Sequence, residues 1–133
     1  MRAFILLVVV IGWLGASTIK DYDTGLMWQD NYDSKSIKRD WQGAKNYCQE
    51  LTLAGYSDWR LPTIKELQSI VDITRADPAI KKIFKNVASK DYWSASEDVS
   101  SAKYAWKVGF DDGYSYYYRK SFECFVRCVR GRQ

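Results

Sequence analysis

The spacing of apolar residues changes near Lys90, and this change restricts the chain to a fold that contains both helices and strands. Between residues 40 and 84 the apolar residues recur every three or four positions, as they do in amphipathic helices. After Lys90 this spacing is replaced by a two-residue period: Tyr104, Trp106, Val108 and Phe110 alternate with Ala105, Lys107 and Gly109, as in a half-buried strand. Helices followed by a run of strands predict an α+β domain with a mainly antiparallel sheet. The 133 residues correspond to one such domain.

Two helices and a short third one are predicted in the first half of the chain. The first begins after Asp40, a suitable N-cap, and ends near Gly55, because glycine permits a left-handed backbone. The second has the clearest start, since Thr63 lies three residues before Glu66 in the pattern of a capping box. The short third helix is predicted within residues 78–84.

Strands are predicted on both sides of the helices. Two of them precede the helices, at residues 18–20 and 26–29, and four follow, at residues 92–96, 104–110, 114–118 and 122–130. Asp111-Asp112-Gly113 is a hairpin turn of the Asp-Gly type. Because strands occur near both ends of the chain, we expect one sheet to join the two ends.

The first 17 residues have the pattern of a secretory signal peptide. Arg2 supplies a positive charge, residues 3–14 are apolar, and small residues follow at 15–17. The apolar stretch is shorter than the about 20 residues of a membrane-spanning helix, so no stable span is expected after cleavage. Cleavage after Ala16 or Ser17 leaves one domain at residues 18–133, which we expect in the periplasm, on the cell surface or in the medium.

Export changes the chemistry expected of the three cysteines, because thiols outside the cytosol tend to pair. Cys48 lies on the apolar face of the first predicted helix. Cys124 and Cys128 fall on one face of the last predicted strand. Either of them is a suitable partner for Cys48, with one thiol left over. Such a bond closes a loop of about 80 residues and stabilises the fold by roughly 2–4 kcal/mol.

Several segments between Thr18 and Arg130 together resemble the Lcl C-terminal domain family. They are Asp23-Thr24-Gly25-Leu26-Met27-Trp28, Trp41-x-x-Ala44-x-x-Tyr47-Cys48-x-x-Leu51, the stretch WRLPTIKEL from Trp59 to Leu67, Tyr92-Trp93-Ser94, and Val126-Arg127-Cys128-Val129-Arg130. The resemblance implies a C-type-lectin-like fold in which helices pack on a twisted antiparallel sheet. It also implies that Cys48 pairs with Cys128, and Cys124 departs from the family pattern. The family's name-giving member binds sulfated polysaccharides, which makes an anionic polymer the implied ligand.

The end of the chain holds the predicted contact surface. Alternation sends Tyr114, Tyr116 and Tyr118 to one side of a strand and Tyr117 to the other, and a small domain cannot bury both sides. Tyrosine suits sugar rings and protein partners alike, and arginine binds sulfate or carboxylate through paired donors. The competing interpretation is cross-strand aromatic packing. The predicted ligand-binding residues are Tyr114, Tyr116, Tyr117, Tyr118, Arg119, Lys120, Arg127 and Arg130.

Composition argues against several classes of function. The net charge of +4 is too small to indicate a nucleic-acid partner. The chain has no histidine, so the usual base near neutral pH and the commonest metal ligand are missing, and we expect no catalytic residue and no metal. Calcium is the one cofactor considered, with Glu97, Asp98, Asp111 and Asp112 as candidate ligands. These carboxylates are only adjacent pairs, whereas calcium needs six to eight convergent oxygens, so no cofactor is expected.

The sequence therefore predicts an exported binding module that recognises an anionic glycan or another cell-envelope polymer, as an adhesin does. A second hypothesis is a protein–protein module of an envelope assembly, in which Cys124 forms an intermolecular disulfide. A remote third is a copper-dependent thiol oxidase related to the formylglycine-generating enzymes, with Cys124 and Cys128 as its thiols. The sequence leaves the oligomeric state open.

Overall fold

The computed structural model describes residues 17–131, so the predicted signal peptide lies outside the described residues. The elements in chain order are β1 (Thr18–Asp21), β2 (Leu26–Gln29), the 3-10 helix η1 (Tyr32–Lys35), β3 (Lys38–Arg39), α2 (Trp41–Glu50), α3 (Ile64–Gln68), β4 (Asp91–Glu97), β5 (Tyr104–Gly109), β6 (Ser115–Arg119), β7 (Cys124–Phe125) and β8 (Val129–Arg130). They confirm the α+β class. The C-type-lectin-like character stays a prediction.

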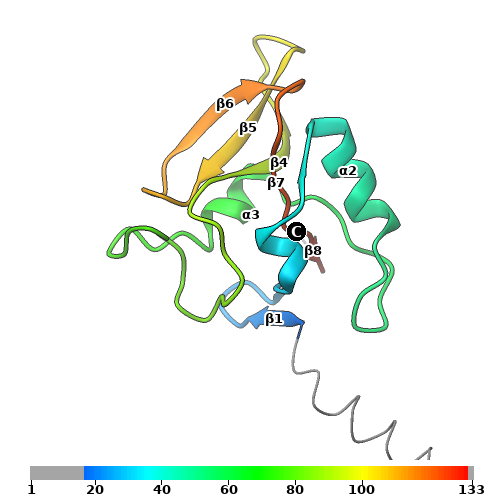
Figure 1. The fold of residues 1–133 in the computed structure, drawn as a ribbon, viewed down its shortest axis with the longest axis vertical. Coiled ribbons are helices and arrows are strands. Elements are labelled where there is room, and N and C mark those ends of the chain that lie inside the picture. The colour runs from blue at the N-terminus through cyan, green and yellow to red at the C-terminus, as the bar shows by residue number, and fades with distance from the viewer. Residues whose placement is uncertain (1–16, 132–133) are drawn as a thin grey trace, which may run out of the picture.

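The strands form two sheets, which Figure 1 shows one above the other. The smaller sheet has the order β1-β2-β8, and the larger has the order β3-β7-β4-β5-β6. Strand pairs are antiparallel except for the single parallel bridge between β4 and β7. Because β8 pairs with β2, the two ends of the described chain meet in one sheet, as expected.

The first two predicted helices begin at the N-cap residues that the sequence indicates. The carboxylate of Asp40 accepts a hydrogen bond from the Gly43 N–H at 2.8 Å and caps α2. In α3, the Thr63 hydroxyl accepts from the Glu66 N–H at 3.1 Å, and the Glu66 carboxylate accepts from the Thr63 N–H at 2.8 Å. The capping box is therefore complete. Helix α2 ends earlier than predicted, at Glu50, and the left-handed Gly55 belongs to the turn that follows.

The short third helix predicted within residues 78–84 is not formed. The backbone of this segment bonds to other segments: the Asp72 N–H donates to the Ala79 carbonyl at 3.2 Å, and the Ala79 N–H donates to the Phe110 carbonyl at 2.7 Å. Val71 and Ile80 form an isolated β-bridge. A helix needs these backbone groups for its own turns, so the apolar spacing here reflects burial of Ile80 and Phe84 in the core rather than helical structure.

The last predicted strand, residues 122–130, is two strands in different sheets. Residues 126–128 cross from the larger sheet to the smaller one, between β7 and β8. At the crossing, the Cys128 N–H donates to the side-chain oxygen of Gln29 at 3.0 Å, and the Gln29 N–H donates to the Cys128 carbonyl at 2.9 Å. Alternation along the sequence therefore does not assign faces in this segment.

The larger sheet separates two hydrophobic clusters. One lies between the two sheets and α3, and Tyr92 and Val108 point into it. The other lies against α2, and Trp93 and Ala105 point into it. These clusters bury both faces of β4 at Tyr92 and Trp93, and they include Val108 and Ala105 of β5. Tyr104 and Trp106 of β5 belong to neither cluster, and β6 lies at the margin of the sheet. The marginal position of β6 is what leaves its tyrosines exposed.

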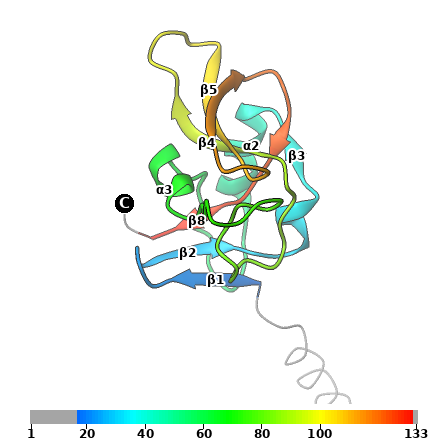
Figure 2. The same cartoon turned by 90° about the vertical axis from the view of Figure 1, so that its left-hand side faces the viewer.

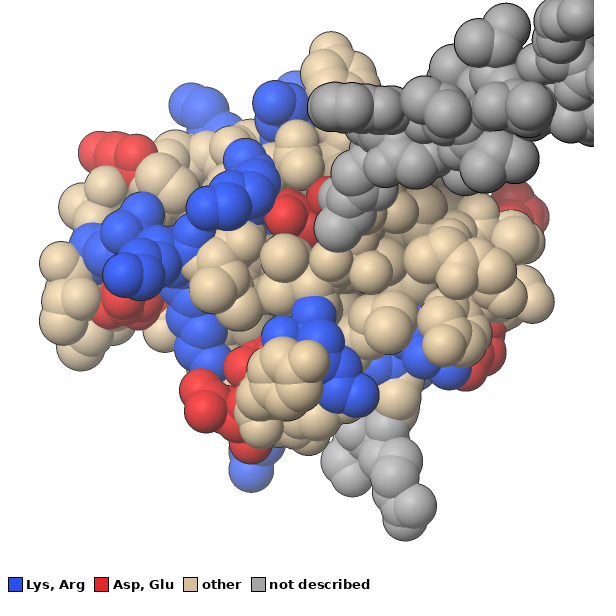
Figure 3. Space-filling model, turned by 90° about the horizontal axis from the view of Figure 1, so that it is seen from below, with Lys and Arg blue, Asp and Glu red and all other residues tan. Residues whose placement is uncertain are grey.

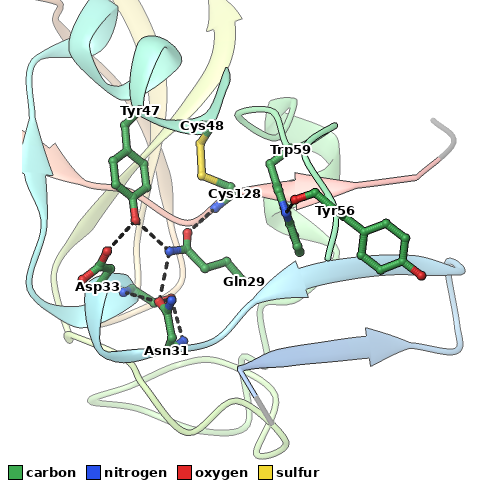
Figure 4. The surroundings of a disulfide bond; sticks show 9 residues. Gln29, Asn31, Asp33, Tyr47, Cys48, Tyr56, Trp59 and Cys128 are labelled. Atoms are coloured by element: carbon green, nitrogen blue, oxygen red, sulfur yellow. Dashed lines mark hydrogen bonds between the residues drawn. A yellow bond between two sulfur atoms is a disulfide. The ribbon is translucent and has the colours of Figure 1, made fainter. Parts of the chain in front are cut away.

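A disulfide joins Cys48 on α2 to Cys128, 80 positions along the chain, and confirms the pairing that the family resemblance implied. Figure 4 shows the row of hydrogen-bonded polar side chains beside the disulfide. The Gln29 amide donates to the Tyr47 hydroxyl at 3.0 Å, and this hydroxyl donates to the Asp33 carboxylate at 2.8 Å. Burial, helped by the Asp33 hydrogen bond, raises the pKa of Tyr47 to about 12. The disulfide thus joins α2 to the crossing segment, and the hydrogen bonds of Gln29 attach β2 to both.

Candidate functional site

Exposed tyrosines concentrate on and next to β6. Tyr114 is 62% exposed, Tyr116 50% and Tyr117 53%, while Tyr118 is partly buried. The expectation that a small domain leaves some of these rings in solvent therefore holds. Because β6 is the outer strand of its sheet, β5 is the only strand that pairs with it within residues 17–131.

Three aromatic rings and one guanidinium group lie together on one face of β5 and β6. Trp106 is opposite Tyr117, and Tyr104 is opposite Arg119. The ring of Tyr117 is centred 5.5 Å from that of Tyr104 and 5.7 Å from that of Trp106. We call this group, Tyr104, Trp106, Tyr117 and Arg119, the aromatic face. Tyr104 and Trp106 are absent from the residues predicted above, although the Asp111–Gly113 turn sets the register that brings them to Tyr117.

Arg119 supplies the positive charge of the aromatic face. Its guanidinium carbon lies 5.7 Å from the centre of the Tyr104 ring. Among residues 17–131, no carboxylate forms an ion pair with Arg119. Its donors are therefore available to an anionic group that comes to rest against the rings.

A hollow of about 330 Å³ lies at the edge of the aromatic face, lined by Tyr104, Tyr117, Asp98, Ser100 and Ser101. The Ser100 hydroxyl donates to the Asp98 carboxylate at 2.8 Å. Rings therefore lie beside hydroxyl and carboxylate groups in one concave place. Flat apolar surface next to hydrogen-bonding groups is the combination that a sugar ring needs.

On the opposite face of the hairpin, Tyr118 is packed against its neighbours whereas Tyr116 stays half exposed. The Lys107 ammonium is 2.8 Å from the Asp91 carboxylate and lies 5.1 Å and 4.9 Å from the rings of Tyr116 and Tyr118. The Tyr118 ring also packs against Trp93, at 6.0 Å. For Tyr118 the structure supports cross-strand aromatic packing instead of ligand contact.

Lys120 is held by the fold. Its ammonium donates to the Glu97 carboxylate and lies 4.2 Å from the centre of the Trp41 ring. The hydrogen bond from Lys120 lowers the pKa of Glu97. Lys120 therefore fastens the end of β6 to β4 and α2 and is less available to a ligand than Arg119.

The sequence model of the Lcl C-terminal domain family matches residues 17–130, almost the whole described structure. The chain belongs to the Lcl C-terminal domain family. The matched span of this Lcl C-terminal domain includes both sheets, the disulfide and the aromatic face. Among curated proteins, none matches the chain significantly. Over residues 17–131, the domain has no helix of the length and apolarity that a membrane crossing requires.

Arg127 does not belong to the contact surface of the Lcl C-terminal domain, and this part of the prediction is wrong. It is fully buried. Its guanidinium donates to the Gln29 carbonyl at 2.6 Å, to the Asp30 carboxylate at 3.2 Å and to the Asn86 carbonyl at 2.6 Å. The chain crosses between the sheets at this point, so the side chain points inward and fastens β2 to the loop before β4.

Arg130 lies on the smaller sheet, in β8, and the fold does not bring it to β6 (Figure 1). Its guanidinium donates to both oxygens of Asp58, at 2.6 and 3.0 Å, and stacks 3.6 Å from the ring centre of Tyr56. The hydrogen bond from Arg130 lowers the pKa of Asp58. Of the three predicted arginines, only Arg119 lies beside the exposed tyrosines of β6.

Cys124 is not placed for the roles that the sequence suggested. It is 2% exposed, and burial raises the pKa of its thiol to about 12. An intermolecular disulfide would require the core to open. Because Cys128 is bonded to Cys48, Cys124 and Cys128 do not form the thiol pair of the copper hypothesis. Of the acidic residues considered for calcium, Asp112 accepts a hydrogen bond from the Tyr114 N–H within the hairpin turn.

A wider hollow, of about 820 Å³, lies at the other end of the domain between β1 and residues 72–83. Its charges are of both signs, and the Lys81 ammonium pairs with Asp21 at 3.3 Å and with Asp23 at 3.0 Å. Figure 3 shows this lower face, where basic side chains gather on one side with carboxylates close to them. Because Lys81 is already paired and three carboxylates, Asp21, Asp23 and Asp72, line this hollow, it is a weaker candidate for an anionic ligand than the aromatic face.

Proposed function

We propose that this Lcl C-terminal domain is an exported, non-catalytic binding module that recognises an anionic glycan or another cell-envelope polymer through the aromatic face. The observation that carries the proposal is the group of three adjacent rings, Tyr104, Trp106 and Tyr117, beside the unpaired Arg119 and a small hollow lined with hydroxyl groups.

Each part of the aromatic face has a role in this proposal. The exposed ring of Tyr117 stacks on the apolar side of a sugar, with the Trp106 ring beside it on the same face. Asp98, Ser100 and Ser101 line the hollow that receives the sugar hydroxyls. Arg119 binds a sulfate or carboxylate group through two parallel N–H donors.

We assign the charged part of the site to Arg119 alone. Arg127 is buried, Arg130 is paired on the other sheet, and Lys120 is paired with Glu97. Binding therefore depends on ring stacking more than on charge, and we expect a modest decrease in affinity as salt rises.

A protein–protein module remains the second candidate. Tyr114 and Tyr116 are exposed outside the aromatic face, and exposed tyrosines are also common in protein interfaces. The form of this hypothesis that depends on Cys124 loses its support, because the thiol is buried.

Retention on dextran sulfate at low salt, compared with neutral dextran, tests the proposal. We expect the wild-type domain to be retained, Arg119→Ala to elute earlier, and Lys120→Ala to change elution less. Arg75→Ala is the matched control, because it removes the same charge from an exposed arginine at the other end of the domain. Absence of retention, or an equal loss with Arg75→Ala, contradicts the role of the aromatic face.

A further inference from the structure

The outer edge of β6 is open. In the order β3-β7-β4-β5-β6, this strand has a partner on one side only, and no other strand within residues 17–131 covers its second side. Figure 1 shows β6 as the outermost strand of the larger sheet, and Figure 2 views the molecule from that side, with β6 in front. The backbone groups on this edge are not bonded to another strand of the described residues.

The hydrogen bonds between β6 and β5 determine which backbone groups of β6 point toward β5 and which point away from it. The Gly109 N–H donates to the Tyr114 carbonyl at 2.9 Å, and the Lys120 N–H donates to the Lys103 carbonyl at 2.9 Å. Because residues in an antiparallel ladder bond to their partner in alternation, Tyr116 and Tyr118 bond to β5 in the same phase. The N–H and C=O groups of Ser115, Tyr117 and Arg119 therefore point outward, and the Arg119 carbonyl also accepts from the Phe122 N–H.

Nothing in the sequence of β6 protects this edge in the usual ways. Strands at the edge of a sheet commonly carry lysine, proline or a bulge that prevents pairing with another chain. Ser115–Arg119 contains no proline, pairs with β5 without a register shift, and has its one charge at its end. Its centre is Tyr117, an aromatic residue of high β propensity.

We propose that two copies of this chain pair antiparallel through β6, with Tyr117 opposite the partner's Tyr117. The outward groups at positions 115, 117 and 119 are symmetric about Tyr117, so a two-fold axis pairs them in both strands, and the Arg119 carbonyl then accepts from the partner's Ser115 N–H as well as from the Phe122 N–H. Ser115 then lies opposite the partner's Arg119, which keeps the two arginines apart. On the other face, Tyr116 lies opposite the partner's Tyr118, a favourable cross-strand pair.

Such a dimer joins the two five-stranded sheets into one and places two aromatic faces side by side on it. The inference goes beyond the proposed function and does not depend on it, because the association requires no glycan. Pairing of two five-residue strands buries little surface, so we expect a weak dimer rather than a permanent one.

Sedimentation velocity over about 10 μM to 1 mM protein, a range suited to a weak interface, tests the inference. Ser115 offers a matched pair of variants, because the same position takes either sign of charge opposite the partner's Arg119. We expect the wild type to dimerise, S115K to weaken the dimer and S115E to strengthen it, each by about tenfold over two symmetric pairs. Tyr22→Lys, at an 88% exposed site on the other sheet, is expected to change nothing.

Three results overturn the inference. The first is a wild-type protein that stays monomeric over the whole concentration range. The second is a dimer that S115K and S115E shift in the same direction, because the charge of Arg119 is then irrelevant to it. The third is a dimer that Tyr22→Lys weakens as much as S115K does. Glycan retention is measured separately, so failure of the dimer leaves the proposed binding role to be judged on its own result.

Discussion

Trp106 and Tyr117 lie directly opposite each other on β5 and β6, with their ring centres 5.7 Å apart. The two residues are far apart in sequence, and the hairpin turn at residues 111–113 sets the strand register that brings them together. Tyr116, the next residue along β6, points to the opposite face and contacts Lys107. Two neighbouring tyrosines of nearly equal exposure therefore belong to different surfaces, which allows a controlled comparison.

We predict that Tyr117→Ala lowers binding to the glycan much more than Tyr116→Ala does. Loss of one stacked aromatic ring costs about 1–2 kcal/mol in a partly exposed site, or roughly tenfold in affinity. A glycan array read with wild type and both variants measures the effect. Equal losses in the two variants would show that the aromatic face is not the contact surface.

The sequence predicts the features that depend on short-range patterns. Thr63 and Glu66 form a capping box, Asp111–Gly113 forms a hairpin turn, and Tyr104–Gly109 alternates as a strand, because each pattern encodes its own local geometry. The disulfide partner of Cys48 required the family resemblance, since the residue pattern left two partners open.

Other features depend on contacts that the sequence does not display. Residues 124–126 and 128–129 are apolar on either side of Arg127, and nothing in this pattern marks the crossing between sheets. Arg127 looks like a surface residue, and only the fold shows the carbonyls and the Asp30 carboxylate around it. Residues 78–84 likewise have helical spacing, but their backbone bonds to Asp72 and Phe110 instead.

Replacement of Arg127 tests its interior role. We predict that Arg127→Met destabilises the domain by about 3–5 kcal/mol, because it leaves the buried Asp30 carboxylate without its cation. Arg119→Met, the control, removes an exposed guanidinium and is expected to change the free energy of unfolding by less than about 0.5 kcal/mol. Urea unfolding followed by tryptophan fluorescence gives both values. If Arg127→Met were as mild as the control, the buried network would not hold β2 to the loop before β4.

Removal of the disulfide tests the link between α2 and the crossing segment. The double variant Cys48→Ala, Cys128→Ala is expected to lose roughly 2–4 kcal/mol of unfolding free energy, because the unfolded chain gains the freedom of an 80-residue loop. Cys124→Ala leaves the disulfide intact and removes one buried sulfur, so its loss should be clearly smaller. Urea unfolding of the three proteins under identical conditions checks the order. A double variant as stable as Cys124→Ala would contradict it.

Alkaline pH provides a further prediction, because two acidic groups of the fold, one buried and one partly buried, have pKa values raised to about 12. These are the Cys124 thiol, whose ordinary pKa is about 9, and the Tyr47 hydroxyl, whose ordinary pKa is about 10. The unfolded chain releases these protons at lower pH than the folded chain does. The stability from each group is therefore complete below its ordinary pKa and is lost as pH rises toward about 12.

Unfolding free energies at several pH values between about 8 and 12, the window of these two groups, measure the loss. Comparison in a Cys124→Ala background removes thiol exchange with the disulfide and leaves Tyr47 as the group of interest. There we expect Tyr47→Phe to be less stable than its parent at pH 8, since the hydrogen bond to Asp33 is missing, and to lose less stability above pH 10. If the free energies of unfolding of the two proteins decreased equally as pH rises, Tyr47 would not be the group that retains its proton in the fold.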